Sequence, residues 1–382
     1  MLLSEVTHSG FKLAPAFTPP IDSERRLLGL LFRHGELTQA EITRAIGLTQ
    51  SMVSRLVSGL QAKGMIGIGA RLPNGRGQPS PALHLKPDYT YTLGVSLLAD
   101  AISFDLMDFA GTLLWRGHTA MPSMSQAAVR EQLARFKASM LSESGIDERR
   151  LFAAGVGISA FFVGDGALMN PPALLDDWAL VDIAPVVSEV LGLPVLVDND
   201  GNVATIGEGL RGAGRRFRHL AYFQITNGFG GGLIVNGQPF RGAYGNAGEF
   251  AALWQCLGIE HPNLERLRLL LKAHGVDFAT VSELIAELDV AHPGVEAWLA
   301  EAGPAFSLAA TGASAVIDCE AIVLGGRIPR SLAEKLAARI HIAGTNRRDR
   351  PRPLPEIVIS ETPGDAVSLG AAVFALQSTF FS

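Results

Sequence analysis

The stretch ITNGFGGGLIVNG, residues 225–237, decides the fold, because it places five glycines in thirteen positions directly after a strand-like run at 220–225. Glycine has no Cβ, so a turn rich in it lets backbone N–H groups approach an anion closely. The pattern predicts a strand, a turn of the kind that holds phosphate, and a returning strand at 232–235. The residues of this turn are Asn227, Gly228, Gly230 and Gly231.

The composition is that of a globular protein with several domains. With 382 residues, of which 48% are hydrophobic and 18% charged, we expect two or three domains with large cores rather than disorder. No run of about 18 apolar residues is present and the N-terminal stretch is a poor signal peptide, so we expect a cytoplasmic protein without a membrane span. The two cysteines, Cys256 and Cys319, fit a reducing compartment and cannot form a four-ligand zinc site alone.

The charge of the chain is uneven. Residues 21–90 carry nine Lys and Arg against five Asp and Glu, whereas the whole chain has a net charge of −5. We call residues 21–90 the basic front. A small basic front on a large acidic body predicts that only the front binds a polyanion.

Three helical patterns lie close together in this basic front. The first begins after Asp22. The second opens with the capping-box sequence Thr38-Gln-Ala-Glu41 and stops at Gly47. The third begins near Thr49 and carries one apolar stripe. A helix, a tight turn and a second helix form the helix-turn-helix arrangement that reads double-stranded DNA.

The N-terminal end of the third helix provides the candidate DNA contacts. Its polar face carries Gln50, Ser51, Ser54 and Arg55. Gln and Arg side chains read base edges, while Ser hydroxyls and the helix N-terminus suit phosphates.

A wing is predicted behind these helices. Strand-like pieces at 65–72 and 82–85 flank the flexible sequence PNGRGQPSP. We expect Arg71 on the first strand and Arg76 at the tip to contact DNA, with Arg76 reaching a minor groove. The alternative is a small helical domain with a hairpin that binds no DNA.

The remainder of the chain reads as two α/β halves. Each half begins with strands joined by hairpins and continues with strands separated by helices, and such halves resemble the actin-like, ribonuclease H-like architecture of sugar kinases. Ligands lie in the cleft between the halves of such a body. The predicted fold class is therefore α/β, with an N-terminal extension at 1–20, a winged helix-turn-helix at 21–87, and a two-lobed body at 88–382 that divides near 200–215.

Several motifs in a fixed order carry a family resemblance that covers about residues 22–378. The winged front and the glycine-rich stretch are accompanied by VDNDGNVATIGEG (197–209), RGAYGNAGEF (241–250), IVLGGRI (322–328) and GDAVSLGAA (364–372). This set resembles the ROK family, which groups repressors, open reading frames and sugar kinases. The chain is most similar to the repressor branch that includes the N-acetylglucosamine repressor and Mlc-type regulators, because the kinases of the family lack a winged domain.

The resemblance implies a cleft in which part of the kinase machinery survives. Asn199 and Asp200 match the family's Asn-Asp pair, in which Asp is the base that faces a sugar hydroxyl; the alternative role is that of a helix N-cap. Glu249 matches a sugar-binding Glu, and Asn170 lies where the family places a sugar-contacting Asn. The His that follows this Glu in most members and the zinc cysteines have no counterpart here, so no metal and no other cofactor is expected.

The nucleotide side of the cleft is altered. Kinases of the family have an acidic residue followed by Gly-Gly-Thr, where this chain has Ser96, Leu97, Leu98, Ala99 and Asp100. Side chains at Leu98 and Ala99 would fill space that phosphates need, and an unpaired Asp100 would repel them. In the second turn Asn227 replaces a Thr. We therefore expect no kinase activity, with Asp200 a relic of the catalytic base.

The sequence thus predicts a DNA-binding regulator, most simply a repressor of carbohydrate genes, whose body senses a sugar or sugar phosphate. A two-fold operator requires a homodimer, or a tetramer built from dimers. The alternatives are an ATP-dependent sugar kinase with an added DNA-binding domain and a body that binds a protein partner instead of a sugar.

Overall fold

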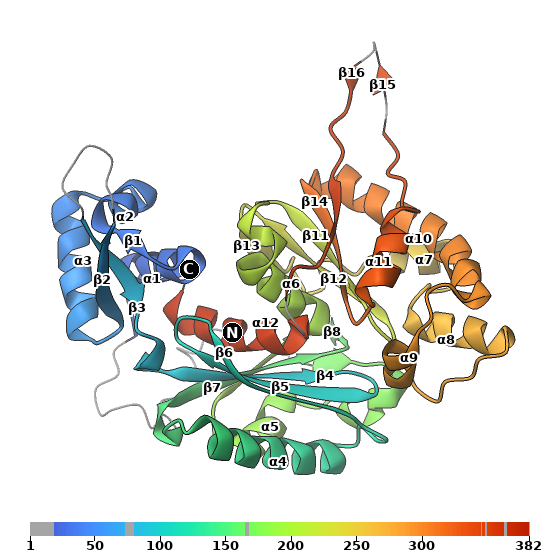
Figure 1. The fold of residues 1–382 in the computed structure, drawn as a ribbon, viewed down its shortest axis with the longest axis horizontal. Helices are drawn as coiled ribbons and strands as arrows, with labels where there is room; N and C mark the ends of the chain where they lie inside the picture. Colours follow the sequence, from blue (N-terminus) through green and yellow to red (C-terminus); the bar gives the residue numbers. More distant parts are fainter. Residues whose placement is uncertain are drawn as a thin grey trace.

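A computed structural model describes residues 19–72, 80–164, 168–344, 346–347, 350–362 and 365–381. Figure 1 shows a small N-terminal head beside a larger body of two lobes. Across the described ranges, no helix combines the length and the apolar character that crossing a bilayer demands.

The head is a winged helix. Its helices are α1 (Asp22–His34), α2 (Gln39–Ile46) and α3 (Gln50–Ala62), and its sheet has the order β1 (Leu37–Thr38), β3 (Ser80–Leu85), β2 (Ile66–Leu72). The predicted capping box is confirmed, because the Thr38 and Glu41 side chains accept from each other's backbone N–H groups. Gly47 closes α2 with φ 73°, a left-handed conformation that glycine adopts without strain.

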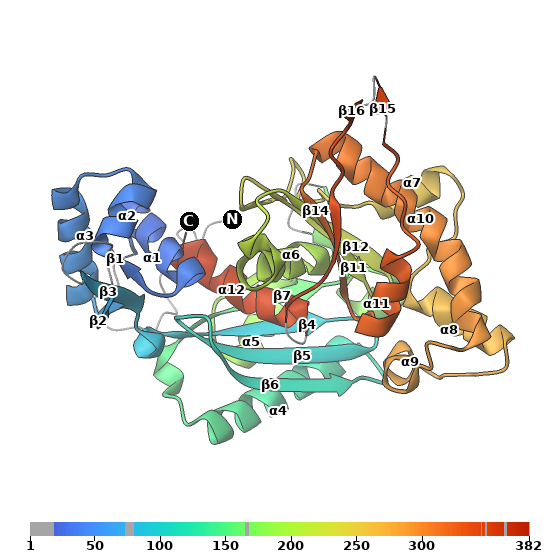
Figure 2. The same ribbon diagram turned by 45° about the horizontal axis from the view of Figure 1, so that its top comes forward.

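The first lobe is built on a five-stranded sheet. Three antiparallel strands are followed by two that run parallel to the first, in the order β6 (Leu113–Ala120), β5 (Ala101–Asp108), β4 (Tyr91–Leu97), β7 (Leu151–Ile158), β10 (Val195–Asn199). Helices α4 (Gln126–Ser144) and α5 (Ile183–Leu191) cover one face. Helices α6 (Asp200–Arg211) and α12 (Ala366–Phe380) lie on the other face, toward the second lobe (Figure 2).

The second lobe repeats this topology. Its sheet has the order β13 (Gln238–Phe240), β12 (Phe229–Val235), β11 (Leu220–Ile225), β14 (Ala321–Gly326), β17 (Glu356–Ile359). The helices that surround it are α7 (Ala251–Cys256), α8 (Leu264–Ala273), α9 (Val281–Glu287), α10 (Pro293–Ile317) and α11 (Arg330–Ala337). The duplicated strand order confirms the predicted α/β fold with a two-lobed, sugar-kinase-like body.

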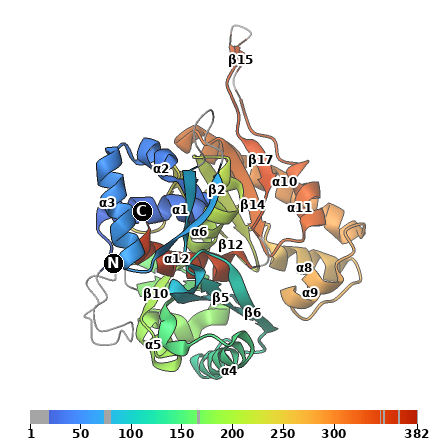
Figure 3. The ribbon, with the colours of Figure 1, turned by 60° about the vertical axis from the view of Figure 1, so that its left-hand side comes forward.

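Two short hairpins were not predicted. One pairs β8 (Phe161–Val163) with β9 (Leu168–Asn170), at the cleft side of the first lobe. The other pairs β15 (Asn346–Arg347) with β16 (Arg350–Pro351) and projects away from the second lobe (Figure 3). Strands of two or three residues carry too little periodicity to be read from a sequence.

The glycine-rich stretch has a different structure from the one predicted. Strand β12 already begins at Phe229, so Gly230 and Gly231 pair with β11 and the turn itself comprises only residues 226–228. The glycines serve packing: a Cβ on Gly232 would lie 2.3 Å from Oγ1 of Thr205 on α6, and one on Gly201 would lie 2.4 Å from the carbonyl oxygen of Gly231. Glycine here lets helix α6 lie directly on the sheet of the second lobe.

Helix α12 lies equally close to the first lobe and to α6. A Cβ on Gly94 of β4 would lie 1.9 Å from the Ser368 carbonyl oxygen, and one on Gly155 of β7 would lie 2.0 Å from that of Ala371. A Cβ on Gly370 would lie 1.8 Å from the Val203 carbonyl oxygen of α6. The centre of the molecule is therefore a stack of sheet, α12, α6 and sheet in which backbones touch.

The head is packed onto the end of α12. The Phe32 ring of α1 lies 4.5 Å from the Phe381 ring, and Arg25 donates to the Phe381 carbonyl oxygen at 2.8 Å. Arg33 donates to the carbonyl oxygen of Gly237, in the β12–β13 turn of the second lobe, at 3.0 Å. One hydrophobic core runs from the head into α12 and β5, so the head is part of a continuous structure with the body.

The substitution Gly370→Ala should disrupt the central helix crossing. The added methyl group has no room beside the Val203 backbone, so we expect urea denaturation to show a loss of about 3 kcal/mol or more in the free energy of unfolding. Gly59→Ala is the control, because a Cβ there would meet only the Glu24 carboxylate at 3.8 Å. On the exposed helix α3, alanine should stabilise by up to about 1 kcal/mol. Equal stability of both variants would contradict the contact.

Candidate functional site

The four candidate DNA contacts of α3 share one exposed face. Gln50, Ser51, Ser54 and Arg55 are all solvent-exposed, while Val53 and Val57 of the same helix are buried in the head. Thr49 caps the helix, its Oγ1 accepting from the Met52 N–H. This leaves a polar helix N-terminus free to meet a nucleic acid.

The wing residues are only partly described. The backbone of Arg71 lies in β2, where Arg71 pairs with Pro81 after an irregularity in the register. Arg76 lies outside the described residues. Both remain predictions as DNA contacts.

Asn199 and Asp200 stand where strand β10 enters helix α6. Asn199, and not Asp200, is the N-cap: its Oδ1 accepts from the Asn202 N–H at 3.1 Å, and its Nδ2 donates to the Ala160 carbonyl oxygen. Asp200 is the first residue of the helix and accepts from Ser159 Oγ at 2.5 Å. The capping alternative therefore applies to Asn199, and both oxygens of the Asp200 carboxylate accept hydrogen bonds, from Ser159 and from the Gly201 N–H.

The Asp200 carboxylate is buried, with 4% of its surface exposed. Burial raises its pKa, and the nearby Asp365 adds to this, while the hydrogen bonds from Ser159 and the Gly201 N–H act in the opposite direction. A carboxyl group in this setting can exchange hydrogen bonds with an uncharged ligand, either as acceptor or, when protonated, as donor.

Glu249 lies on the second lobe, in the segment between β13 and α7. Burial raises its pKa to about 7, and the negative charge of Asp200 contributes to the same shift. The structure thus brings together the two predicted carboxylates in one electrostatic environment. Asn170 is exposed at the end of the β8–β9 hairpin, opposite Phe161.

A clamp that sequence reasoning missed joins the lobes beside these residues. Asn246 donates to and accepts from the backbone of Phe162, at 2.9 and 2.8 Å. Arg241 forms an ion pair with the buried Asp198 at 3.0 Å. The sequence shows that RGAYGNAGEF is polar, but it does not show which residues these side chains contact. The partner of Asn246, for example, lies 84 residues earlier in the chain.

Asp100 has a different role from the one expected. It is not unpaired: Arg327 Nη1 lies 2.5 Å from its Oδ1, and both the N–H and the hydroxyl of Ser282 donate to its Oδ2 at 3.0 Å. Arg327 also donates to Asn227 Oδ1 at 3.1 Å. The turns of both lobes that were expected to flank a phosphate are therefore tied to each other by one arginine.

Leu98 and Ala99 of the first-lobe turn are both buried, Leu98 together with Val203 and Val367. Gly228, in the second-lobe turn, is exposed, and a Cβ there would meet nothing within 4 Å. The first turn is thus filled by side chains, whereas the second keeps an open backbone.

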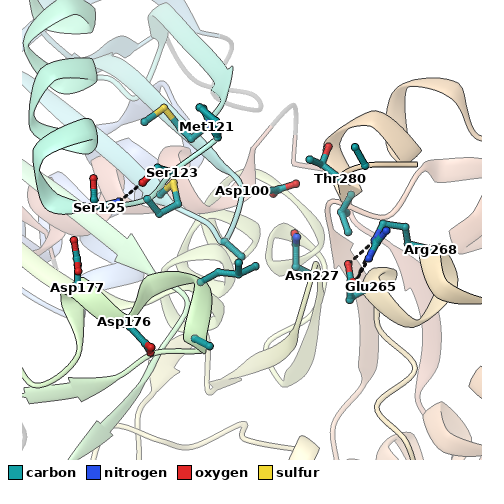
Figure 4. Close-up of a pocket in the computed structure, with 17 residues that line it drawn as sticks. Asp100, Met121, Ser123, Ser125, Asp176, Asp177, Asn227, Glu265, Arg268 and Thr280 are labelled. Atoms are coloured by element: carbon teal, nitrogen blue, oxygen red, sulfur yellow. Dashed lines mark hydrogen bonds and ion pairs between the residues drawn. The ribbon is translucent and has the colours of Figure 1, made fainter. Parts of the chain in front are cut away.

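A cavity of about 560 Å³ opens between the lobes next to these turns. Figure 4 shows Asp100 and Asn227 at its centre, with the first lobe on one side and helices α8 and α9 on the other. Residues of the first lobe that line it include Met121, Ser123, Asp176 and Asp177, and those of the second include Glu265, Arg268 and Thr280.

Aromatic side chains pack around the segment after Glu249, where the family resemblance would place zinc ligands. Trp254 of α7 is fully buried, its ring lies 4.4 Å from that of Phe229, and its Nε1 donates to the Ala305 carbonyl oxygen. His261 lies beside the same ring at 5.8 Å. In the described part of the chain, no three His, Cys, Asp or Glu side chains form a group that could hold a metal.

The fold and the site define a class: a winged helix joined to a two-lobed sugar-kinase-like body. The ROK family model matches residues 92–251, and the MarR family model matches residues 18–74. The chain thus contains a ROK family domain behind a MarR-type winged helix, and the family resemblance drawn from the motifs is confirmed.

Two similar sequences illustrate the relationship. An uncharacterized protein of Sinorhizobium fredii is 27% identical over 365 residues, which cover 94% of this chain and 92% of that one. The xylose repressor of Bacillus spizizenii is 24% identical over 228 residues, which cover 59% of each chain.

Two solved structures share the fold. A ROK family transcriptional regulator, homologous to the E. coli Mlc protein, has a TM-score of 0.68 at 17% identity and covers 94% of this chain and 96% of its own. A ROK family glucokinase of Streptomyces griseus, in complex with glucose and AMPPNP, has a TM-score of 0.56 at 21% identity and covers 75% of this chain and 99% of its own. The first match covers nearly the whole chain, whereas the second covers a share of the chain about as large as the two-lobed body.

Glu249→Gln should change how the stability of the protein depends on pH. Because the fold raises the pKa of Glu249 from 4.5 to about 7, the folded state holds an extra proton between these values. The free energy of unfolding of the wild type should therefore fall, relative to the variant, as pH rises through this window, and the difference should level off above it. Urea titrations at about pH 5 and about pH 8 measure this.

Glu131→Gln, on the exposed face of α4, is the control and should follow the wild type at both pH values. Parallel pH profiles of the wild type and Glu249→Gln would show that Glu249 titrates as in an unfolded chain.

Proposed function

We propose that this protein is a sugar-responsive transcriptional repressor, in which the winged helix binds operator DNA and the kinase-like body senses the effector. The observation that carries the proposal is the continuous core between head and body. Because α1 is packed against the end of α12 and also contacts the β12–β13 turn, a change in the angle between the lobes must move the head.

The DNA contacts proposed are those of the exposed α3 face, Gln50, Ser51, Ser54 and Arg55, together with Arg71 and Arg76 of the wing. A single winged helix covers one half-site, so a homodimer, or a tetramer of two dimers, would bind a two-fold operator. The xylose repressor relationship and the fold shared with a transcriptional regulator support this assignment.

The effector site proposed is the cleft around Asn199, Asp200 and Glu249, with Asn170 at its rim. Its residues come from both lobes, so a ligand held there would fix the angle between them. Operator DNA and effector should then influence each other's affinity by the same factor.

The ion pair between Asp100 and Arg327 supports a body without kinase activity. Phosphoryl transfer needs a nucleotide cradle open to the polyphosphate and its metal. Here Arg327 spans the two turns and Leu98 is buried in the first of them. The alternative, an ATP-dependent sugar kinase with an added head, is favoured by the survival of Asp200 at the base position.

Arg55→Ala should weaken DNA binding by about 10- to 100-fold, the range expected for the loss of one good base contact. The probe is a labelled duplex selected from a random library by the wild-type protein, and fluorescence anisotropy gives the dissociation constant. Arg135→Ala, on the far side of the first lobe, should leave the constant unchanged. If Arg55→Ala binds like wild type, α3 does not face the DNA.

Addition of an effector sugar should change the dissociation constant of the same duplex by at least about tenfold, a typical coupling between two sites. D-xylose, D-glucose and N-acetyl-D-mannosamine, with their phosphate esters, form the panel. Incubation with ATP, magnesium and these sugars should release no ADP. Sustained ADP release that Asp200→Asn abolishes would establish the kinase instead.

A further inference from the structure

Gln224 is a buried polar side chain of strand β11. Along β11, Phe223 and Ile225 pack with the helices behind the second lobe, while Leu220 and Tyr222 pack toward α6. The alternation of a strand therefore points Gln224 toward α6 and the cleft. Only 1% of its surface is exposed, and its Oε1 has no hydrogen-bond partner.

Gln224 and Asp200 share the same space above Gly230. Gly230 is the partner of Gln224 in the β11–β12 pair. A Cβ on Gly230 would lie 3.6 Å from Asp200 Oδ1 and 4.0 Å from the Gln224 Cβ. The missing side chain thus leaves room between the amide of one lobe and the carboxylate of the other.

Ser96 provides a matching group from the first lobe. It lies on β4 beside Gly157, and a Cβ on Gly157 would lie 3.6 Å from the Asp200 Cα. Leu93, Val95 and Leu97 of the same strand face α4 and α5, so Ser96 faces α6. It is fully buried, and its Oγ has no hydrogen-bond partner.

Two buried oxygens without a partner, Oε1 of Gln224 and Oγ of Ser96, therefore lie on strands that approach Asp200 from the two lobes. Leaving a buried polar group without a partner costs about 1–3 kcal/mol, and such groups in native proteins call for a missing partner. A ligand with several hydroxyl groups would supply partners to both. Since both side chains are buried, such a ligand reaches them only when the packing between the lobes opens.

The charged groups around this place favour an uncharged ligand over an anion. Asp365 contributes to the raised pKa of Asp200, and Asp200 contributes to that of Glu249. Three arginines of the described ranges lie between or beside the lobes, and each forms an ion pair with a carboxylate. The pairs are Arg241 with Asp198, Arg327 with Asp100, and Arg268 with Glu265. Asp176 and Asp177 line the cavity between the lobes (Figure 4).

We propose that the effector is an uncharged polyhydroxyl compound, a free sugar rather than its phosphate ester, and that Gln224 and Ser96 hydrogen-bond its hydroxyls beside Asp200. This rests on the proposed function of the body as a sugar sensor and names the chemical class that the sensor accepts. Gln224 then helps to determine specificity, because a site built to bond hydroxyl groups rejects analogues that lack them.

The test is calorimetric titration of the full chain with D-xylose, D-glucose and N-acetyl-D-mannosamine, each beside its phosphate ester. A free sugar should bind at least about tenfold more tightly than its ester. The variant Gln224→Met has nearly the same volume but no amide, and it should lose at least about tenfold in affinity for that sugar. Gln238→Ala, on the exposed edge strand β13, is the control and should bind as wild type does.

Thermal unfolding separates ligand binding from a structural role. Replacing an amide whose buried Oε1 has no partner by an apolar side chain of similar shape should leave the melting temperature unchanged or raise it. A lower melting temperature with unchanged sugar affinity would assign Gln224 to the fold and overturn the proposal.

The remaining outcomes distinguish this inference from the proposed function. A phosphate ester that binds as tightly as its free sugar, or more tightly, overturns the uncharged effector and leaves the sensor intact. If neither the free sugars nor the esters bind, both the proposed sugar-sensing function and the assignment of Gln224 are wrong.

Discussion

The architecture depends on the contact between helices α6 and α12, whose backbones touch at Gly370 and Val203 in the centre of the molecule. Each helix also lies directly on the sheet of one lobe, α12 on the first and α6 on the second. Because backbones touch at these crossings, a movement of one lobe is transmitted as a displacement of packed helices. Since α12 ends against α1, the head is coupled to the same stack.

The edges of the cleft are held by polar contacts rather than by a hydrophobic seam. Arg327 joins Asp100 to Asn227 at one edge, and Arg241 and Asn246 join the lobes at the other. Buried ion pairs gain little net free energy because their desolvation offsets the attraction. Closure of the body is therefore only weakly favoured by these contacts, and a ligand that prefers one lobe angle can shift the equilibrium with modest binding energy.

The sequence predicted a structural element correctly where that element depends on contacts between residues close together in the chain. The capping box at Thr38, the left-handed Gly47 and the hydrophobic stripe of α3 each depend on residues within a few positions, so the winged helix could be predicted closely. The motifs also singled out Asp200 and Glu249, and the charge of the first contributes to the raised pKa of the second. Residues 229–231 were misread as turn, because glycine serves equally in a turn and in a strand that another helix approaches, and only the position of α6 distinguishes the two.

The sequence by itself determined the longer helices and strands, their order and the class of fold, because hydrophobic periodicity and capping act over short stretches of chain. Only the tertiary structure decided what the charged and polar residues do. Asp100 looked like an isolated carboxylate until Arg327, 227 residues later, was found to neutralise it. Likewise, an unpartnered Gln224 becomes meaningful only once the lobes place it next to Asp200. Electrostatic and hydrogen-bond partners are set by distance in space, and a linear pattern of residue types does not contain that distance.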